Sequence, residues 1–420
     1  MTLPLVAAVE MGYGHLRPAR ALADRLGTEV LRIDRAPVAG REELRLWRAS
    51  RRFYEIASRF SQLPFLGSLL EAVTAIPPLY PHRDLSAPTF QVRSLDRLIR
   101  RGLGRGLALR LLESGAPLVT TFFTAALAAE RFGVEHIYCV ATDVDLNRSW
   151  APPDPAATRI NYLAPTGRAR RRLIAYGVPR ERIEVTGFPL PHELLGGPDL
   201  PVLERNLAAR LVRLDPKGVF REQIGREVHH FLGDLPAREE GKPPLAVFAV
   251  GGAGAQAELA HQLLPVLRPL LEQGRLRLAL VAGVRRQVAA RFAEGVRAAG
   301  LEPALGRGIE ILVEDDLDAY FDRFNALLAD ADLLWTKPSE MVFFGALGLP
   351  LVLTRPVGVH ERYNRRWAIE NGAGLKMREP GQAAFWLREW LSEGTLAAAA
   401  WFGYLRLPKF GLYRILEIVG

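Results

Sequence analysis

Twice in the chain, an apolar run of strand length leads directly into a glycine-rich turn and then into a helical pattern. The first run covers residues 3–9 and leads into the turn at 12–15. The second covers residues 245–250 and leads into the turn at 251–254. Strand, glycine turn and helix in this order open a βα unit of a parallel sheet. Two such openings far apart in the chain predict two separate α/β domains.

Further short apolar runs alternate with helical stretches after each opening. Residues 18–26 place apolar side chains at helical spacing, and Gly27 follows as a stop signal. This alternation predicts doubly wound sheets covered by helices, with strands at 29–33, 117–121, 136–140, 276–281, 309–313, 333–335 and 350–353.

Composition agrees with an ordinary folded protein of two domains. The chain has 420 residues, of which 49% are hydrophobic and 24% charged, so disordered and fibrous classes are excluded. Cys139 is the single cysteine, which excludes an internal disulfide. No Cys/His cluster offers a zinc site.

Proline and glycine crowd residues 189–198, which predicts a linker between the domains. Residues 201–230 are helical and polar in pattern. We therefore predict an N-terminal domain over 1–190, a linker and helical insert over 191–243, a C-terminal domain over 244–400, and a C-terminal helix over 401–420 that packs back on the N-terminal domain.

The net charge is +9, and only five of the 55 basic residues are lysine. Arginine binds phosphates and carboxylates through a planar fork, although codon bias can also explain its excess. The arginines cluster at 41–59, 93–110 and 168–172, all in the first half. Their positions favour an anionic surface or acceptor over nucleic acid.

The first arginine cluster has a helical pattern with two interpretations. Arg45, Arg48 and Arg52 follow helical spacing, and Trp47 lies among them. A basic helix with aromatic side chains can lie in a membrane interface. It can equally be a helix of the first domain whose arginines face water.

His15 is the candidate reactive residue of the first glycine turn. A histidine that follows a strand lies at the carboxyl edge of its sheet, where open α/β sheets bind ligands. Imidazole can also accept a proton at neutral pH. A structural role at the start of a helix is the alternative.

The second half carries two further candidate clusters. Ser339 and Glu340 follow a strand and open a helix, where Glu340 is either a capping group or a ligand-binding group. His360, Glu361 and Asn364 lie close together in a polar loop. Imidazole, carboxylate and amide at this spacing suit a ligand with many hydroxyl groups.

Residues 252–257 also fit a dinucleotide-binding pattern, so a nicotinamide enzyme is a further alternative. The acidic residue expected after the next strand is missing. Arg285 and Arg286 stand there instead, and they suit a 2′-phosphate.

Taken together, these motifs resemble the GT-B glycosyltransferases. The chain is similar to the monogalactosyldiacylglycerol synthases, the processive diacylglycerol glucosyltransferases and the enzyme that adds N-acetylglucosamine to lipid I, all family 28-like. The motifs that carry the resemblance are Gly12-x-Gly14-His15-x-x-Pro18-Ala19, Gly251-Gly252-x-Gly254-x-Gln256, Thr336-Lys337-Pro338-Ser339-Glu340 and His360-Glu361-x-x-Asn364.

The resemblance implies two Rossmann-like domains that face a central cleft. It also implies an inverting transfer that needs no cofactor and no obligatory metal, with the nucleotide-sugar as a substrate. It implies His15 as the base, with Asp143 as the second choice. It implies a donor-binding group made of Gly14, Gly251, Gly252, Gly254, Gln256, Ser339, Glu340, His360, Glu361 and Asn364.

We therefore expect a hexosyltransferase that moves a sugar from a nucleotide-sugar, a UDP-sugar by preference, to a lipid-linked hydroxyl. The alternatives are a UDP-sugar 2-epimerase and a non-catalytic protein of the same fold. Residues 1–10 lack the basic start of a signal peptide. The expected place is the cytoplasm, with peripheral attachment to the inner face of the membrane and no nucleic-acid partner.

Overall fold

The computed structural model describes residues 2–10, 12–60, 76–81, 83–237, 242–250, 256–356 and 358–420. The chain divides into two compact units. The first comprises Met1–Leu190, Pro356–Asn364 and Pro408–Gly420, and the second comprises Pro191–Arg355 and Arg365–Leu407. Residues 191–243, predicted as a linker and insert, thus group with the second unit.

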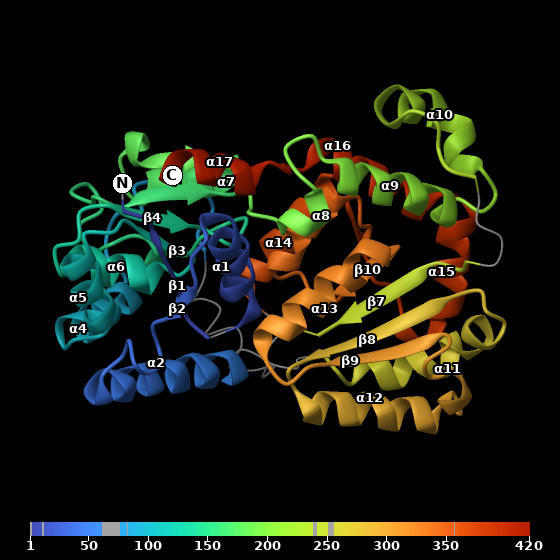
Figure 1. Ribbon diagram of the computed structural model, residues 1–420, viewed down its shortest axis with the longest axis horizontal. Coiled ribbons are helices and arrows are strands. Elements are labelled where there is room, and N and C mark those ends of the chain that lie inside the picture. The colour runs from blue at the N-terminus through green and yellow to red at the C-terminus, as the bar shows by residue number, and fades with distance from the viewer. Residues whose placement is uncertain are drawn as a thin grey trace. The chain divides into compact units, whose positions relative to one another are not determined.

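The first unit is built on a six-stranded parallel sheet in the order β2-β1-β3-β4-β5-β6 (Figure 1). Its strands are β1 (Leu5–Ala8), β2 (Val30–Arg32), β3 (Leu118–Thr120), β4 (Ile137–Val140), β5 (Asn161–Ala164) and β6 (Ile183–Val185). Its helices are α1 (Tyr13–Leu26), α2 (Arg41–Phe60), α4 (Phe90–Arg100), α5 (Arg105–Ser114), α6 (Phe123–Arg131), η1 (Arg148–Trp150), α7 (Gly167–Ala175), η2 (Arg180–Arg182) and α17 (Gly411–Val419).

Burial explains why these residues form strands and covering helices. The central strands of the sheet are apolar on both faces because helices cover both; Val6, Ala7 and Ala8 of β1 are fully buried. Helix α1 buries one apolar face and ends at Gly27, whose left-handed backbone (φ 66°) suits glycine. The predicted helix at 18–26 therefore begins earlier, within the glycine turn itself.

The second unit contains another six-stranded parallel sheet, in the order β12-β11-β10-β7-β8-β9. Its strands are β7 (Leu245–Ala249), β8 (Arg277–Gly283), β9 (Ile309–Val313), β10 (Leu333–Thr336), β11 (Leu351–Leu353) and β12 (Gly374–Lys376). Its helices are α8 (His192–Leu195), α9 (Pro201–Leu214), α10 (Val219–Leu232), α11 (Leu259–Glu272), α12 (Arg286–Ala298), η3 (Glu302–Ala304), α13 (Leu317–Asp330), η4 (Glu340–Leu347), η5 (Pro380–Gln382), α15 (Ala383–Ser392) and α16 (Thr395–Arg406). Helix α14 (Val359–Glu370) begins in the first unit and continues into the second.

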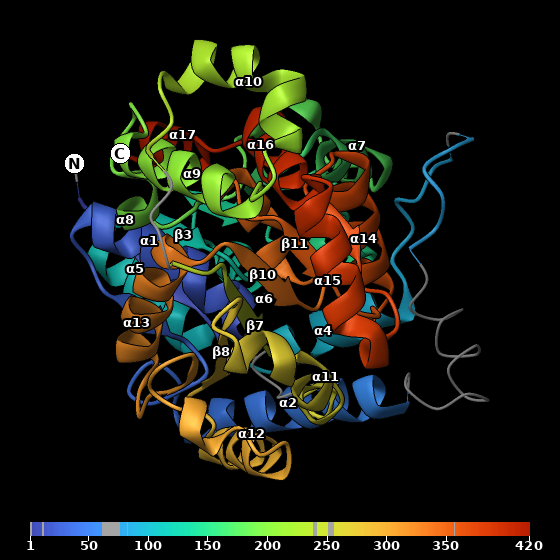
Figure 2. The same cartoon turned by 90° about the vertical axis from the view of Figure 1, so that its right-hand side faces the viewer.

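Helix α9 belongs to the second unit because buried arginines attach it to the sheet. Arg210 is 1% exposed and donates to the carbonyls of Ala331, Leu347 and Gly348. Burial lowers the pKa of Arg210 to about 10. Arg213 forms an ion pair with the buried Asp332 at 2.7 Å. Helix α16 packs against α9 and also contacts α10, which lies above both helices in the ribbon views (Figure 1, Figure 2).

Each sheet has one topological switch point, where the strand order reverses because successive strands are added first on one side of the first strand and then on its other side. In the first unit this point lies between β1 and β3, and in the second between β7 and β10. Open α/β sheets bind ligands in the crevice at the carboxyl ends of these strands. The predicted doubly wound α/β architecture is therefore confirmed, including every strand predicted from an apolar run.

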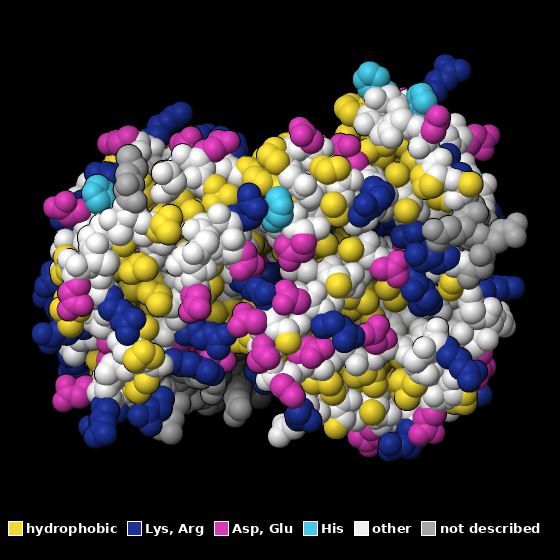
Figure 3. All heavy atoms as spheres, in the orientation of Figure 1, with side chains coloured by type: hydrophobic (Ala, Val, Ile, Leu, Met, Phe, Trp, Pro, Cys, Tyr) yellow, Lys and Arg dark blue, Asp and Glu magenta, His cyan; other side chains and the backbone are white. Residues whose placement is uncertain are grey.

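None of the helices in the described residues is both long and apolar enough to cross a membrane. Basic and acidic side chains are interspersed over the face shown in Figure 3. On that face the positive net charge is therefore not gathered into one patch.

Candidate functional site

His15 lies at the switch point of the first sheet. It occupies the first turn of α1, next to the partly buried Gly14. Its Nδ1 lies 2.9 Å from the carbonyl oxygen of Thr121, and the Thr121 hydroxyl donates to the carbonyl of His15 at 2.7 Å. Thr121 follows β3, so these paired bonds join the loops after β1 and β3. The Thr142 hydroxyl, which follows β4, lies 3.3 Å from the same Nδ1.

The contact with Thr121 fixes which ring nitrogen of His15 carries the proton. A carbonyl oxygen can only accept, so Nδ1 of His15 is the donor. In a neutral imidazole the other nitrogen, Nε2, is then the one without a proton. The ring also packs edge-on against Phe122, with centroids 4.8 Å apart. The arrangement suits a general base with a fixed orientation.

Asp143, the second predicted base, follows β4 in a segment that is held tightly. Val144 and Asp145 are fully buried, whereas Asp143 is partly exposed. Asp145 accepts from the Nε atoms of Arg168 and Arg172, both at 2.7 Å. Its charge is therefore neutralised within the unit, and Asp143 carries the available carboxylate of the two.

Arg168 and Arg172, which we predicted as part of an anion-binding surface, are thus structural in this segment. Arg172 is fully buried and also donates to the carbonyl of Pro77 at 2.7 Å. Burial would lower the pKa of Arg172, but the hydrogen bonds and charge of Asp145 outweigh this effect and raise the pKa. The spacing of four residues on α7 brings both guanidinium groups to one carboxylate. Sequence reasoning missed this role because the pattern reads as a charged face.

The three loop residues predicted to bind the donor sugar have different surroundings. His360 is exposed, Glu361 is 2% exposed and Asn364 is fully buried. The amide of Asn364 contacts Asp143 and the backbone of Val144 rather than solvent. Thr121, Thr142 and Tyr363 are contacts of this region that the sequence did not indicate.

Ser339 and Glu340 lie at the switch point of the second sheet, directly after β10. Each is 9% exposed. Ser339 precedes η4 without capping it, and its hydroxyl oxygen has no hydrogen-bond partner among the described residues. Glu340 is the first residue of η4. A buried hydroxyl at a helix N-terminus, beside a carboxylate, is a site that a ligand with phosphate and hydroxyl groups completes.

Gln256 belongs to the same edge of the second sheet. Its amide nitrogen donates to the carbonyl of Arg355 at 2.7 Å, and its amide oxygen accepts from the hydroxyl of Thr354. These bonds join the loop after β7 to the loop after β11. The predicted donor-binding residues Gly251, Gly252 and Gly254 lie outside the described residues.

Helix α2 buries part of what we predicted as a membrane-binding face. Trp47 is only 4% exposed, and its indole donates to Glu43 at 3.1 Å. Glu43 also accepts from the backbone N–H groups of Gly104 and Gly106, at 2.8 and 3.0 Å. Trp47 is therefore a core residue, since positions 43 and 47 share the inward face.

Two of the predicted membrane-binding arginines remain on the surface of α2. Arg45 and Arg48 are exposed. The side chain of Arg52 lies outside the described residues.

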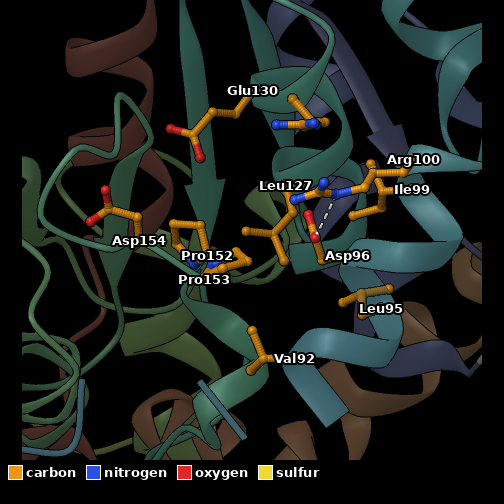
Figure 4. A pocket seen from close by; sticks show the side chains of 11 residues that line it. Val92, Leu95, Asp96, Ile99, Arg100, Leu127, Glu130, Pro152, Pro153 and Asp154 are labelled. Atoms are coloured by element: carbon orange, nitrogen blue, oxygen red, sulfur yellow. Dashed lines mark hydrogen bonds and ion pairs between the residues drawn. The ribbon is translucent and has the colours of Figure 1, made fainter. Parts of the chain in front are cut away.

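The first unit also contains a cavity of about 320 Å³ between α4, α6 and the segment at 152–154. Figure 4 shows an apolar wall that includes Ile99 and Leu127. The nearby Asp96 is paired with Arg100 at 2.8 Å. No predicted site residue lines this cavity, so we do not include it in the candidate site.

No protein-family model matches the chain, and no curated protein matches it. Solved structures do resemble it. The structure of MnaA from S. aureus with UDP is 14% identical, covers 100% of this chain and 96% of its own, and has a TM-score of 0.50. The glycotransferase of kitacinnamycin is 14% identical, covers 100% and 99%, and has a TM-score of 0.51. The two Rossmann-like domains thus have the GT-B fold.

Proposed function

We propose that this protein is a glycosyltransferase that moves a sugar from a UDP-sugar to a hydroxyl group of an acceptor. In this proposal the second unit binds the donor and the first unit supplies the reactive groups. His15 in the first unit and the pair Ser339 and Glu340 in the second lie at the switch points of their sheets, where this architecture binds ligands.

The observation that carries the donor assignment is the pair Ser339 and Glu340. A buried hydroxyl without a partner costs free energy unless a ligand supplies the missing hydrogen bond. The start of η4 favours an anion because the first N–H groups of a helix have no carbonyl partner within it and because the helix dipole is positive there. A carboxylate at the same place accepts hydrogen bonds from ribose hydroxyls. A nucleoside diphosphate offers both kinds of group, and one of the similar folds was solved with UDP.

The reaction assigns one role to each candidate residue of the first unit. The acceptor hydroxyl gives its proton to Nε2 of His15, while its oxygen attacks the anomeric carbon. The bond from that carbon to the diphosphate oxygen breaks, and UDP leaves with the electron pair. A single displacement of this kind inverts the anomeric carbon. Asp143 is the second candidate for accepting the proton.

The finer parts of the proposal concern the acceptor and the donor loop. We propose a lipid-linked acceptor and peripheral contact with an anionic membrane on the cytoplasmic side, supported by the exposed Arg45 and Arg48 of α2. Gly251, Gly252 and Gly254 are proposed to hold the diphosphate, and Gln256, His360 and Glu361 to lie near the transferred hexose. The nucleotide-sugar is a substrate, and the proposed mechanism uses no metal or cofactor.

Replacing Glu340 by Gln should weaken UDP binding by roughly 10- to 100-fold, the range expected when hydrogen bonds to a charged group are lost. Calorimetric titration with UDP measures this change. The matched control is Glu294→Gln on α12, an exposed carboxylate that should leave affinity unchanged. Equal UDP affinity of Glu340→Gln and wild type would remove the main support for the donor site.

A nucleotide-sugar 2-epimerase remains the alternative from another reaction class. It would convert UDP-N-acetylglucosamine without any acceptor, whereas the proposed transferase releases UDP only when a hydroxyl accepts the sugar. A non-catalytic protein of this fold would bind UDP but would neither transfer the sugar nor epimerise it.

A further inference from the structure

Asn364 stands in the sequence motif among residues expected to hold the donor sugar, but its contacts in the first unit indicate another role. The side chain is fully buried. Its Oδ1 accepts from the backbone N–H of Val144 at 3.0 Å, and its Nδ2 donates to Oδ1 of Asp143 at 3.1 Å.

The backbone N–H of Val144 fixes the orientation of the Asn364 side-chain amide. A backbone N–H can only donate, so the atom that faces it must be the amide oxygen. The amide nitrogen is then directed at Asp143, where it holds one carboxylate oxygen. The other oxygen of Asp143 is left to accept from a ligand.

The neighbouring residue Tyr363 is held against the same region. The Arg168 guanidinium lies 4.5 Å from the centre of the Tyr363 ring, and the Tyr363 hydroxyl donates to the carbonyl of Ile76 at 3.4 Å. Arg168 is itself fixed by Asp145. Two consecutive residues, 363 and 364, are thus attached to the segment that carries Asp143.

Asp145, the second carboxylate of this segment, is not available to bind a hydroxyl group of the acceptor. Asp145 is fully buried and accepts from Arg168 and Arg172. Within the described residues Asp143 forms no salt bridge. A carboxylate that is partly exposed, unpaired by cations and oriented by an amide is suited to accept a hydrogen bond from a neutral hydroxyl.

We propose that Asn364 is a positioning residue for Asp143, and that Asp143 so oriented accepts a hydrogen bond from a hydroxyl group of the acceptor other than the one that gives its proton to His15. This inference rests on the proposed function for the identity of that hydroxyl. The contact between Asn364 and Asp143 does not depend on it. Asn364 therefore serves the acceptor side of the reaction and is not a ligand of the donor sugar.

The test is Asn364→Asp, which keeps the size of the side chain and the acceptor for Val144. The new carboxylate oxygen faces Oδ1 of Asp143. Because two negative charges at this distance repel each other, the two carboxylates together retain a proton, and the pKa of this pair is raised in the folded state. The other charged groups of this segment are Asp145, Arg168 and Arg172, and the buried Glu361 lies one turn earlier on α14. His15 contacts Thr142, the residue before Asp143. A raised pKa of an acid stabilises the folded state only below the unfolded value of about 3.9. The stability of the variant should therefore fall, relative to wild type, as the pH rises from about 4 to 7.

The matched control is Asn147→Asp in the same loop. Asn147 caps η1 by accepting from Ser149, a role that Asp fills equally well. It adds the same charge, but a carboxylate at an N-cap is favoured in its ionised form, so its stability relative to wild type should stay level or rise slightly over this pH range and should not fall. If the stability of Asn364→Asp relative to wild type also does not fall, the contact with Asp143 is absent and the proposal is overturned.

The second measurement separates positioning from sugar binding. Calorimetry measures the affinities of wild type and of Asn364→Asp for UDP and for UDP-glucose, UDP-galactose and UDP-N-acetylglucosamine. Asn364→Asp should leave the ratio of UDP-sugar to UDP affinity unchanged and lower turnover by roughly 10- to 100-fold. A selective loss of UDP-sugar affinity would instead make Asn364 a sugar ligand. If the wild-type protein binds no UDP-sugar, the proposed function is overturned. That result is seen in the wild type, whereas failure of the proposal for Asn364 is seen only in the variant, so the two failures can be distinguished.

Discussion

Replacing His15 by Ala is expected to lower turnover of the UDP-sugar by about 10²- to 10⁴-fold, the usual contribution of a positioned general base. The physical reason is the contact between Nδ1 and the carbonyl of Thr121 at 2.9 Å, which places the ring proton on Nδ1 and makes Nε2 the basic nitrogen. Because His15 belongs to the first unit and Ser339 and Glu340 to the second, UDP affinity should stay within about twofold of wild type. UDP release and UDP calorimetry measure the two quantities separately.

The control for this substitution is His136→Ala. His136 is exposed at the amino end of β4, the edge of the same sheet opposite to His15. It should retain full turnover. Asp143→Asn provides the comparison that assigns the base: if it loses more turnover than His15→Ala, the proton goes to Asp143 and the proposed order of the two residues is reversed.

The largest expected loss of stability follows from removing Asp145. Its carboxylate is fully buried and is the partner of Arg168 and of the fully buried Arg172. Asp145→Ala leaves the Arg172 charge buried without its counter-ion, which should cost about 3–5 kcal/mol of unfolding free energy. Denaturant unfolding measures it, and because the chain has two units the transition of each should be analysed separately.

A double variant separates the loss of the counter-ion from a general loss of packing. Asp145→Ala combined with Arg172→Met removes both charges and should recover part of the stability lost in the single variant. Asp154→Ala, an exposed carboxylate in the same unit, serves as the control and should cost less than about 0.5 kcal/mol. If Asp145→Ala costs no more than Asp154→Ala, the buried cluster does not stabilise the unit.

Local sequence signals predicted the parts of the fold that depend on local structure. The apolar runs before both glycine turns became β1 and β7, and the first of them placed His15 at the carboxyl edge of its sheet. The run at 333–335 became β10 and placed Glu340 at the carboxyl edge of the second sheet. The strands β5, β6 and β12 were missed because they are short. In addition, β5 begins at Asn161 and β12 at Gly374, both residues with low strand preference.

The remaining features depend on contacts between residues far apart in the sequence. Asn364 and Asp143 are separated by 221 positions, so no local pattern links the amide to the carboxylate. We predicted Trp47 to lie in a membrane interface because arginines surround it in the helical pattern at residues 41–59. Its burial depends on Glu43 and on the turn at Gly104, which only the folded unit brings to it.

The most direct test of the proposed function follows the sugar itself. The protein is incubated with radiolabelled UDP-glucose, UDP-galactose or UDP-N-acetylglucosamine and a lipid extract, and the label is traced into the organic phase. We expect transfer of label from at least one donor, with loss of this transfer in His15→Ala and retention in His136→Ala. Label that remains with the nucleotide for all three donors, or appears only in an epimerised UDP-sugar, would contradict glycosyl transfer to a lipid.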